Sequence, residues 1–368
     1  MGPLTLEMVR EGKITPVKYL ESSVIEHPRF AAAKARALKL PSRTEQGLEA
    51  RFLTITGNPG AGKTTLLKNL EASLHEVRDE RVIRHGVYFQ TPKLPTWRSL
   101  ASAMMGGLDP NFRVPKQWNS TDVIHALKPI VSAKQVTLWL GDEGHRLITR
   151  RTRAVQKDTA DFIVQVLNEL NVSLVMAGLS ELMNLVTVEH VEDGVLGRRR
   201  DSHYFLAAYN WMDVHGRAHF LGFLRHLEQR LLLPRRSLIS EESVAARLYV
   251  ATCGEPGLVV KLLSEALSRA LNHSLDSIEI DLLAEVFSDF VFGNDEDDEL
   301  PDEMDFGSTH EDLAGKSDPK RADPYLCREL PVEDNPLSCP IDNLSVIWRE
   351  YRRFGLSPMS GKIVQVTP

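Results

Sequence analysis

The chain has 368 residues, of which 42% are apolar, 26% are charged and three are cysteines, and this length suits one large or two medium globular domains. The cysteines form no closely spaced pair and no apolar run could span a bilayer, which argues against a disulfide scaffold, a zinc site and a membrane protein. Eight acidic residues within 294–305 outweigh a slightly basic remainder to give the net charge of −6, so global charge neither supports nor excludes a nucleic-acid partner. Because the N-terminus also lacks the apolar stretch of a secretory signal, we expect a cytoplasmic protein.

Residues 1–50 are expected to form an N-terminal arm with a short helix around Pro28–Leu40. Residues 51–215 are expected to form an α/β nucleotide-binding core. It opens with an apolar strand that runs into the pattern Gly-x-x-x-x-Gly-Lys-Thr and then into a helix, which predicts a phosphate-binding loop whose N–H groups converge on a nucleoside triphosphate. The expected ATP-binding residues are Gly57, Asn58, Pro59, Gly60, Ala61, Gly62, Lys63, Thr64 and Thr65.

Each part of this loop has an expected role. Gly57, Gly60 and Gly62 can take up positive φ, which lets the backbone curl around the β-phosphate. Lys63 can reach the β- and γ-phosphate oxygens, and the Thr64 hydroxyl can hold Mg²⁺. The alternative is a glycine turn with no ligand.

A second strand is predicted at Gly86–Gln90, followed by a loop rich in Thr and Pro that contains Lys93. Helices are predicted near Trp97–Met105 and Ser120–Ala133.

The next strand, 136–143, is apolar enough to lie in the centre of a parallel sheet and ends in two carboxylates. Its end lies where open α/β sheets bind ligands, so Asp142 is the expected Mg²⁺ ligand of a Walker B motif. Glu143 is placed to polarise the water that attacks the γ-phosphate, which predicts ATP hydrolysis. Alternatively, the two carboxylates only cap the helix that follows.

A helical pattern at 159–170 precedes a fourth strand, Val172–Gly178. In additional-strand P-loop ATPases this strand lies between those of the two Walker motifs, and a polar side chain at its end senses the γ-phosphate. Ser180 is the candidate sensor. A cap on the next helix is the competing interpretation of Ser180.

Three arginines, 198–200, precede an apolar stretch at Tyr204–Ala208 that could be the fifth strand. An arginine at this point can project into a neighbouring subunit's nucleotide and stabilise charge on the transferring phosphate. Arg199 or Arg200 is the candidate for this finger. A solvated cluster of charges is the alternative.

Residues 216–292 show only helical patterns and are expected to form a small all-helical lid. Its helices are predicted at Leu221–Leu233, Glu241–Ala251, Pro256–Leu271 and Ile280–Phe292.

Residues 293–368 have the acidic, Pro- and Ser-rich composition of a largely disordered tail. Within it, Ile341–Phe354 is amphipathic and predicts a linear element that folds on a partner. The alternative is a segment that packs back on its own body.

The chain resembles the AAA+ ATPases that regulate transposition, the TnsC and TniB family, with MuB more distantly related. Over residues 20–290 the resemblance depends on three motifs besides the phosphate loop: the His-Pro-Arg opening within Ile25–Phe30, the turn Gln90-Thr91-Pro92, and the extended Walker B motif Asp142–Leu147.

The resemblance implies an AAA+ P-loop core with a parallel sheet and a helical lid. It also implies ATP and Mg²⁺ as cofactors, assembly into rings or helical filaments around double-stranded DNA, and a transposase and a TniQ-like target-selection protein as partners. Gly257 stands where many AAA+ proteins have the sensor-2 arginine, and Lys261, one turn later, could substitute for it.

Basic residues gather after the Walker B strand, in a region that lines the central channel of ring-forming relatives. Lysine and arginine neutralise phosphates without regard to base sequence, which suits binding to arbitrary target DNA. The candidate DNA-binding residues are Arg146, Arg150, Arg151, Arg153 and Lys157, together with Lys93. An exposed basic helix with no partner is the alternative.

Two further hypotheses stand beside a DNA-bound regulator of transposition. One is a signalling or defence P-loop switch that acts through its tail on another protein. The other is an ATPase of the secretion-associated ExeA type. Neither requires DNA.

Overall fold

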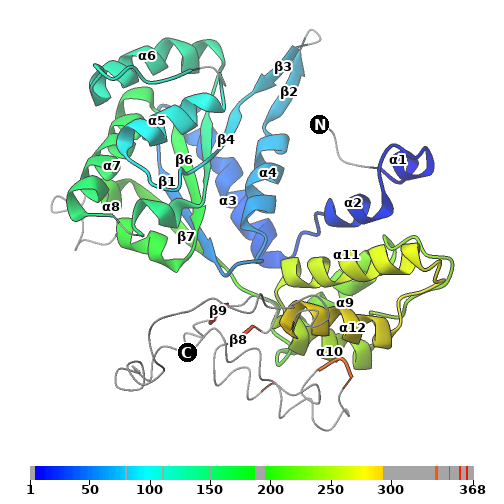
Figure 1. Ribbon diagram of the computed structural model, residues 1–368. Coiled ribbons are helices and arrows are strands. Elements are labelled where there is room, and N and C mark those ends of the chain that lie inside the picture. Colours follow the sequence, from blue (N-terminus) through cyan, green and yellow to red (C-terminus); the bar gives the residue numbers. More distant parts are fainter. Residues whose placement is uncertain are drawn as a thin grey trace, which may run out of the picture. The chain divides into compact units, whose positions relative to one another are not determined.

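The computed structural model describes residues 5–78, 81–109, 112–149, 151–186 and 195–292, together with 336–338, 348, 356–357 and 362–363. The described chain forms two compact units (Figure 1). Residues 26–207 form an α/β unit, and residues 5–25 join the described residues from 208 onward in a helical unit. These boundaries differ from those expected, because the first fifty residues are shared between the two units and the α/β unit ends at residue 207.

A five-stranded parallel sheet forms the centre of the α/β unit, in the order β4-β5-β6-β1-β7. The fourth predicted strand, β6, lies between β1 and β5, as expected for an additional-strand P-loop protein. All residues of β1, β5 and β6 are buried, which explains why these strands are continuous apolar runs. The strands are β1 Phe52–Gly57, β4 Gly86–Gln90, β5 Leu138–Asp142, β6 Ser173–Gly178 and β7 Arg200–Leu206.

Helices cover both faces of this sheet (Figure 1). On one face, α3 (Pro28–Glu45) and α4 (Lys63–Ser73) contribute to a core with Leu53 and Ile55 of β1. On the other face lie α5, α6 and α7, which pack against Phe52 of the same strand. Successive residues of a strand point to opposite faces, so β1 contributes to both cores. The three helices are α5 Trp97–Gly106, α6 Ser120–Ala133 and α7 Arg153–Gln165.

The remaining elements of this unit are short, and one pair was not expected from the sequence. The strands β2 (His75–Arg78) and β3 (Arg81–Arg84) form an antiparallel hairpin that does not join the main sheet. The others are the 3₁₀ segments η1 Gly144–Leu147 and η3 Ser180–Leu185, the π-helical turn η2 Val166–Leu170 that ends α7, and α8 Val195–Arg199.

The helical unit has its own apolar core, built mainly from α9 to α11. Two helices of the N-terminal segment belong to it, and Arg230 lies over the Tyr19 ring of α2 at 4.8 Å. The first lid helix begins at Val214, seven residues before the expected Leu221, because Asp213 caps it by accepting a hydrogen bond from Gly216 N at 2.9 Å. The helices are α1 Leu6–Arg10, α2 Pro16–Glu21, α9 Val214–Glu228, α10 Glu242–Thr252, α11 Pro256–Asn272 and α12 Ile280–Phe292.

The described residues of the tail contact this same unit. Leu337 is buried in its core, and the Trp348 ring lies 5.2 Å from that of Tyr249. At these positions the structure agrees with a segment that packs back on its own body, and not with one left free for a partner. Most of Ile341–Phe354 and the acidic run at 294–305 lie outside the described residues.

Two short strands, β8 (Leu356–Ser357) and β9 (Lys362–Ile363), pair in antiparallel fashion in the tail. Within the part of the chain that the structure describes, no helix combines the length and the apolar character that a membrane crossing requires.

An ion pair joins α3 to β7 in the α/β unit. The Asp201 carboxylate is only 7% exposed and accepts hydrogen bonds from Arg36 Nε at 2.6 Å and from Ser202 Oγ at 2.8 Å, and Arg36 Nη2 donates to its other oxygen. Burial acts to raise the pKa of Asp201, but the hydrogen bonds from Arg36 and Ser202 outweigh it, so that the pKa is lowered.

Asp201→Asn should therefore lower the free energy of unfolding by about 1–2 kcal/mol at pH 7, because it removes the charge from the three hydrogen bonds that Arg36 and Ser202 donate and replaces one acceptor oxygen with an NH₂ donor. A carboxylate whose pKa is lower in the folded state contributes its full stabilisation of the folded state above its unfolded pKa of about 3.9. This stabilisation is lost as the pH falls through the pKa of the folded state. The difference in the free energy of unfolding between variant and wild type should thus become smaller below about pH 4. Urea unfolding at pH 7, 5 and 3.5, with the exposed Asp158→Asn as control, checks this, and a loss equal at all three pH values would contradict it.

Candidate nucleotide-binding site

The loop between β1 and α4 has two glycines in left-handed conformation. Gly60 and Gly62 both have φ of 86°, which side-chain-bearing residues rarely adopt. Gly57 was expected to share this conformation and does not. It is needed for close packing instead, because a Cβ atom there would lie 2.6 Å from the carbonyl oxygen of Leu206 on the neighbouring β7.

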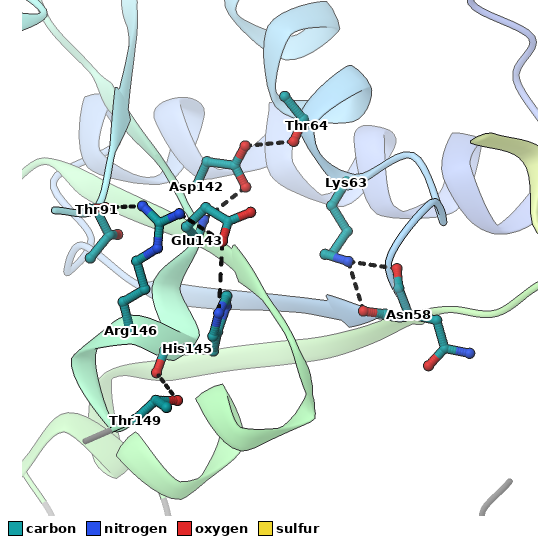
Figure 2. Close-up of polar contacts among 10 residues, drawn as sticks. Asn58, Lys63, Thr64, Thr91, Asp142, Glu143, His145, Arg146 and Thr149 are labelled. Atoms are coloured by element: carbon teal, nitrogen blue, oxygen red, sulfur yellow. Dashed lines mark hydrogen bonds and ion pairs between the residues drawn. The ribbon is translucent and has the colours of Figure 1, made fainter. Parts of the chain in front are cut away.

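Lys63, the first residue of α4, turns its side chain back over the loop (Figure 2). Its Nζ donates hydrogen bonds to the carbonyl oxygens of Gly57 and Asn58, both at 2.7 Å. Gly62, the N-cap of α4, has no side chain to satisfy the first N–H groups of the helix. A cationic side chain beside the N–H groups of a helix N-terminus forms a binding site for phosphate.

Asp142 lies at the end of β5, is 2% exposed, and is the centre of a hydrogen-bond network (Figure 2). Its Oδ2 accepts hydrogen bonds from Thr64 Oγ1 at 2.6 Å and from the Tyr88 hydroxyl at 3.1 Å, and its Oδ1 accepts one from Glu143 N at 2.8 Å. The predicted pair of Thr64 and Asp142 is thus brought together from two distant segments.

Tyr88 was missed from the sequence. Burial, and to a lesser degree the Asp142 carboxylate, raises the pKa of its hydroxyl, which therefore stays protonated and acts as a donor. The pairing of the strands explains this contact: β4 pairs with β5, and Tyr88 lies opposite Leu140, two residues before Asp142. A tyrosine on the strand next to the Walker B strand was the available signal.

The donor set at this point fits Mg²⁺. A hydroxyl and a carboxylate oxygen, 2.6 Å apart, are hard oxygen ligands, and Mg²⁺ is usually bound by one or two such groups together with substrate phosphates. Thr64 and Asp142 would hold the ion, which would neutralise charge on the phosphates of the nucleotide.

Glu143 follows Asp142 in left-handed conformation, with φ of 56° and ψ of 32°. Its carboxylate is turned toward η1, where Oε2 lies 3.3 Å from Arg146 Nη2 and 3.7 Å from His145 Nε2 (Figure 2). It makes no capping hydrogen bond to η1, so the interpretation of Glu143 as a simple helix cap is not supported.

Arg146 is held inside the site. Besides its contact with Glu143, its Nη1 donates to the Thr91 carbonyl oxygen at 2.7 Å, in the loop after β4. His145 is half-buried, and burial lowers its pKa despite the opposing charges of Glu143 and Glu181, which favours a neutral imidazole at pH 7. Arg146 was expected to contact DNA, yet its guanidinium is engaged with its own subunit.

The candidate sensor Ser180 begins η3, two residues after β6 ends, and is exposed at the same edge of the sheet as the phosphate loop. It was alternatively expected to cap the next helix, but the N-cap of η3 is Leu179 and no side chain caps it.

The candidate finger arginines lie at the opposite edge. Arg200 pairs with Phe52 at the start of β1, whereas Gly57 at the end of β1 pairs with Leu206. Arg199 Nη1 forms an ion pair with Glu49 Oε2 at 2.7 Å. Neither arginine is brought together with the phosphate loop of its own subunit.

Lys261 belongs to the helical unit, where its Nζ lies 4.3 Å from the centre of the Phe290 ring. Among the other candidate DNA contacts, Lys93 is exposed after β4 and Arg151 is half-buried before α7. Arg153 and Lys157 are both exposed on α7, and Arg150 lies outside the described residues.

Comparison with known proteins agrees with this geometry. Residues 46–186 match the model of the family described as AAA domain. The protein has the AAA+ P-loop ATPase fold. Solved structures of this fold that resemble the chain include the Aeropyrum pernix ORC2 protein in ADPNP–ADP complexes, with a TM-score of 0.52 and 15% identity over 72% of this chain and 68% of that one. Another is the Aeropyrum pernix ORC1 protein in complex with DNA, with a TM-score of 0.51 and 20% identity over 74% of this chain and 68% of that one.

At these identities the likeness to the ORC proteins shows the fold alone. No curated protein matches the sequence significantly. The AAA+ fold is therefore established, whereas the nucleotide-binding roles of the loop residues and membership of the TnsC and TniB family stay predictions.

Lys63→Ala should weaken ATP binding by about tenfold or more, because it removes a charged hydrogen-bond donor from the phosphate loop. Titration with a fluorescent ATP analogue measures the affinity, and circular dichroism verifies the fold. Lys68→Ala, an exposed lysine on the same helix, is the matched control and should leave the affinity unchanged. Equal affinities of Lys63→Ala and wild type would place the phosphates elsewhere.

Proposed function

We propose that this protein is an ATPase that assembles on duplex DNA in its ATP-bound state and regulates DNA transposition. The observation that carries the enzymatic part is the 2.6 Å hydrogen bond between Thr64 and Asp142, because it joins the phosphate loop to the Walker B carboxylate in one site. Target recognition and delivery of the transposase follow from the family resemblance of the sequence.

In the proposed reaction, Lys63 exchanges the carbonyl oxygens of Gly57 and Asn58 for phosphate oxygens of ATP. Thr64 and Asp142 would hold Mg²⁺. Glu143 turns from Arg146 toward the attacking water and accepts its proton, and Ser180 senses the γ-phosphate from the end of β6. Because Glu143 must first break its contacts with Arg146 and His145, we expect slow ATP hydrolysis.

The position of the finger arginines supports assembly. Arg199 and Arg200 lie at the edge of the sheet opposite the phosphate loop of their own subunit, so they can act only on the nucleotide of a neighbour. A ring or helical filament places one such edge against the next site. ATP in each interface would then stabilise the oligomer. Lys261 is proposed to complete the lid's contact with the nucleotide.

Exposed basic residues on the AAA+ core support contact with DNA. Arg153 and Lys157 are exposed one turn apart on α7, Lys93 is exposed in a loop of the same unit, and the half-buried Arg151 lies just before α7. These side chains can neutralise phosphates of any sequence. The ORC1 protein of the same fold was solved in complex with DNA, which is compatible with this role. A transposase and a TniQ-like protein are the proposed protein partners, in the cytoplasm.

A gel shift on random duplex DNA tests the proposal with ATP, with ADP and without nucleotide. We expect binding that needs ATP, is indifferent to base sequence and is lost in Lys63→Ala. A signalling switch or an ExeA-type ATPase would bind nucleotide with no shift of the DNA, and that result would reject the DNA-bound regulator.

Glu143→Gln should lower ATP hydrolysis about 100-fold or more, because an amide cannot accept the proton of the attacking water. ATP-dependent assembly on DNA should persist or last longer, since the ligands of the phosphates and of Mg²⁺ stay intact. Phosphate release and electron microscopy of the DNA-bound state measure the two properties. Loss of assembly together with hydrolysis would show that Glu143 is structural.

The double variant Arg153→Glu and Lys157→Glu should flatten the salt dependence of DNA binding. Each lost phosphate contact reduces the slope of log affinity against log salt by about 0.9, so a change of about 2 is expected. Lys68→Glu with Lys128→Glu alters the net charge equally, at exposed residues of α4 and α6, and is the control. Equal slopes for the two double variants would place the DNA on another surface.

A further inference from the structure

Tyr88 makes two hydrogen bonds that close a ring of contacts beside the phosphate loop. Its hydroxyl donates to Asp142 Oδ2 at 3.1 Å, and its backbone N–H donates to Glu71 Oε1 at 3.2 Å. Glu71 lies on α4, and Thr64 at the start of the same helix donates to the same oxygen of Asp142 at 2.6 Å. The helix itself closes the ring, because it carries both Thr64 and Glu71.

The bond to Glu71 exists because β4 is an edge strand of the five-stranded sheet. Backbone N–H groups that point away from the neighbouring strand have no strand partner at an edge. For Tyr88, a carboxylate of α4 accepts this hydrogen bond instead. The helix also lies close to β4 at Gly86, where a Cβ atom would be 2.7 Å from Cδ1 of Leu74, the residue that ends α4. The backbone of Tyr88 is thus fixed independently of its side-chain contact.

The hydroxyl of Tyr88 restricts the Asp142 carboxylate. An ionised carboxylate has about four acceptor sites on its two oxygens. Thr64 and Tyr88 occupy two sites on Oδ2, and the backbone N–H of Glu143 occupies one on Oδ1. Because Asp142 is only 2% exposed, solvent does not replace a donor that is lost. Rotation of the carboxylate would break hydrogen bonds on both oxygens, so the group is held in one orientation.

We propose that Tyr88 is a positioning residue of the nucleotide site, which holds Asp142 in the orientation that a magnesium nucleotide requires. This inference rests on the proposed binding of Mg²⁺ by Thr64 and Asp142. Tyr88 acts through Asp142, whereas the phosphate loop with Lys63 binds the phosphates without it. The hydroxyl thereby sets how much Mg²⁺ strengthens nucleotide binding, because hydrogen-bond partners of metal-binding groups commonly change metal affinity by about 10- to 100-fold.

Tyr88→Phe tests this role, because it removes the hydroxyl and keeps the ring. The affinity of the full-length protein for a fluorescent, non-hydrolysable ATP analogue is measured once with Mg²⁺ and once with EDTA. We expect wild type to bind more tightly with Mg²⁺, and we call the ratio of the two affinities the magnesium gain. In Tyr88→Phe this gain should fall about tenfold, while the affinity in EDTA should stay within about twofold of wild type.

Two further variants are controls. Tyr204→Phe alters a half-buried tyrosine of β7 that packs against the same apolar core as Tyr88, and its magnesium gain should equal that of wild type. Thr64→Ala removes a proposed Mg²⁺ ligand and should lose the gain. Urea unfolding of each variant verifies that it is folded.

A double-mutant cycle separates positioning from general damage to the structure. If Tyr88 acts through Asp142, Tyr88→Phe should have no further effect on the magnesium gain of Asp142→Asn, because the carboxylate that it orients is already lost. Damage elsewhere would instead add to the effect of Asp142→Asn and would lower the affinity in EDTA as well.

Electron paramagnetic resonance of Mn²⁺, with the same analogue bound, measures the affinity for the ion directly. Tyr88→Phe should bind Mn²⁺ about tenfold more weakly than wild type, and Tyr204→Phe should bind it as tightly. A full magnesium gain in Tyr88→Phe, or an equal loss of affinity with Mg²⁺ and with EDTA, would overturn the role of Tyr88 and leave the proposed ATPase intact. Wild type without any magnesium gain would reject the proposed magnesium site, and this inference with it.

Discussion

One hydrogen bond joins the two halves of the nucleotide site. Thr64 Oγ1 donates to Asp142 Oδ2 at 2.6 Å and connects residues 78 positions apart in the chain. The contact exists because β1 and β5 run parallel on either side of β6, so that the loop after one and the carboxylate after the other meet at one edge. A shift of one residue in the pairing of β5 would turn Asp142 to the other face of the sheet.

The same parallel arrangement separates the site from its candidate finger. Arg200 begins β7 where β1 also begins, and the phosphate loop lies where both strands end. A strand of six or seven residues spans about 20 Å, which is longer than an arginine side chain. If an arginine of this cluster acts on ATP, the nucleotide belongs to another subunit, and hydrolysis is tied to assembly. Glu143, the proposed base, forms an ion pair with Arg146 of its own subunit, so the proposed base and the candidate finger both depend on contacts beyond the phosphate loop.

A cluster of aromatic side chains lies within the apolar core of the helical unit. The ring centre of Phe220 lies 5.4 Å from that of Tyr209 and 5.6 Å from that of Tyr249. Leu337 of the tail belongs to the same core.

Local patterns were sufficient for the buried strands β1, β4, β5 and β6 and for the phosphate loop, because apolar runs buried on both faces and a glycine-rich loop are properties of consecutive residues. They did not predict the hairpin of β2 and β3, and β7 begins at Arg200 instead of the expected Tyr204. The strand Gly86–Gln90 and the helices at Ser120–Ala133 and Ile280–Phe292 have their predicted bounds. The Tyr88 hydroxyl on Asp142, the hydrogen bond of Arg146 to the Thr91 carbonyl oxygen and the burial of Leu337 could not be predicted in this way. Each depends on which strand or helix lies beside another, and that is set by packing between segments far apart in the chain, which no window of neighbouring residues contains.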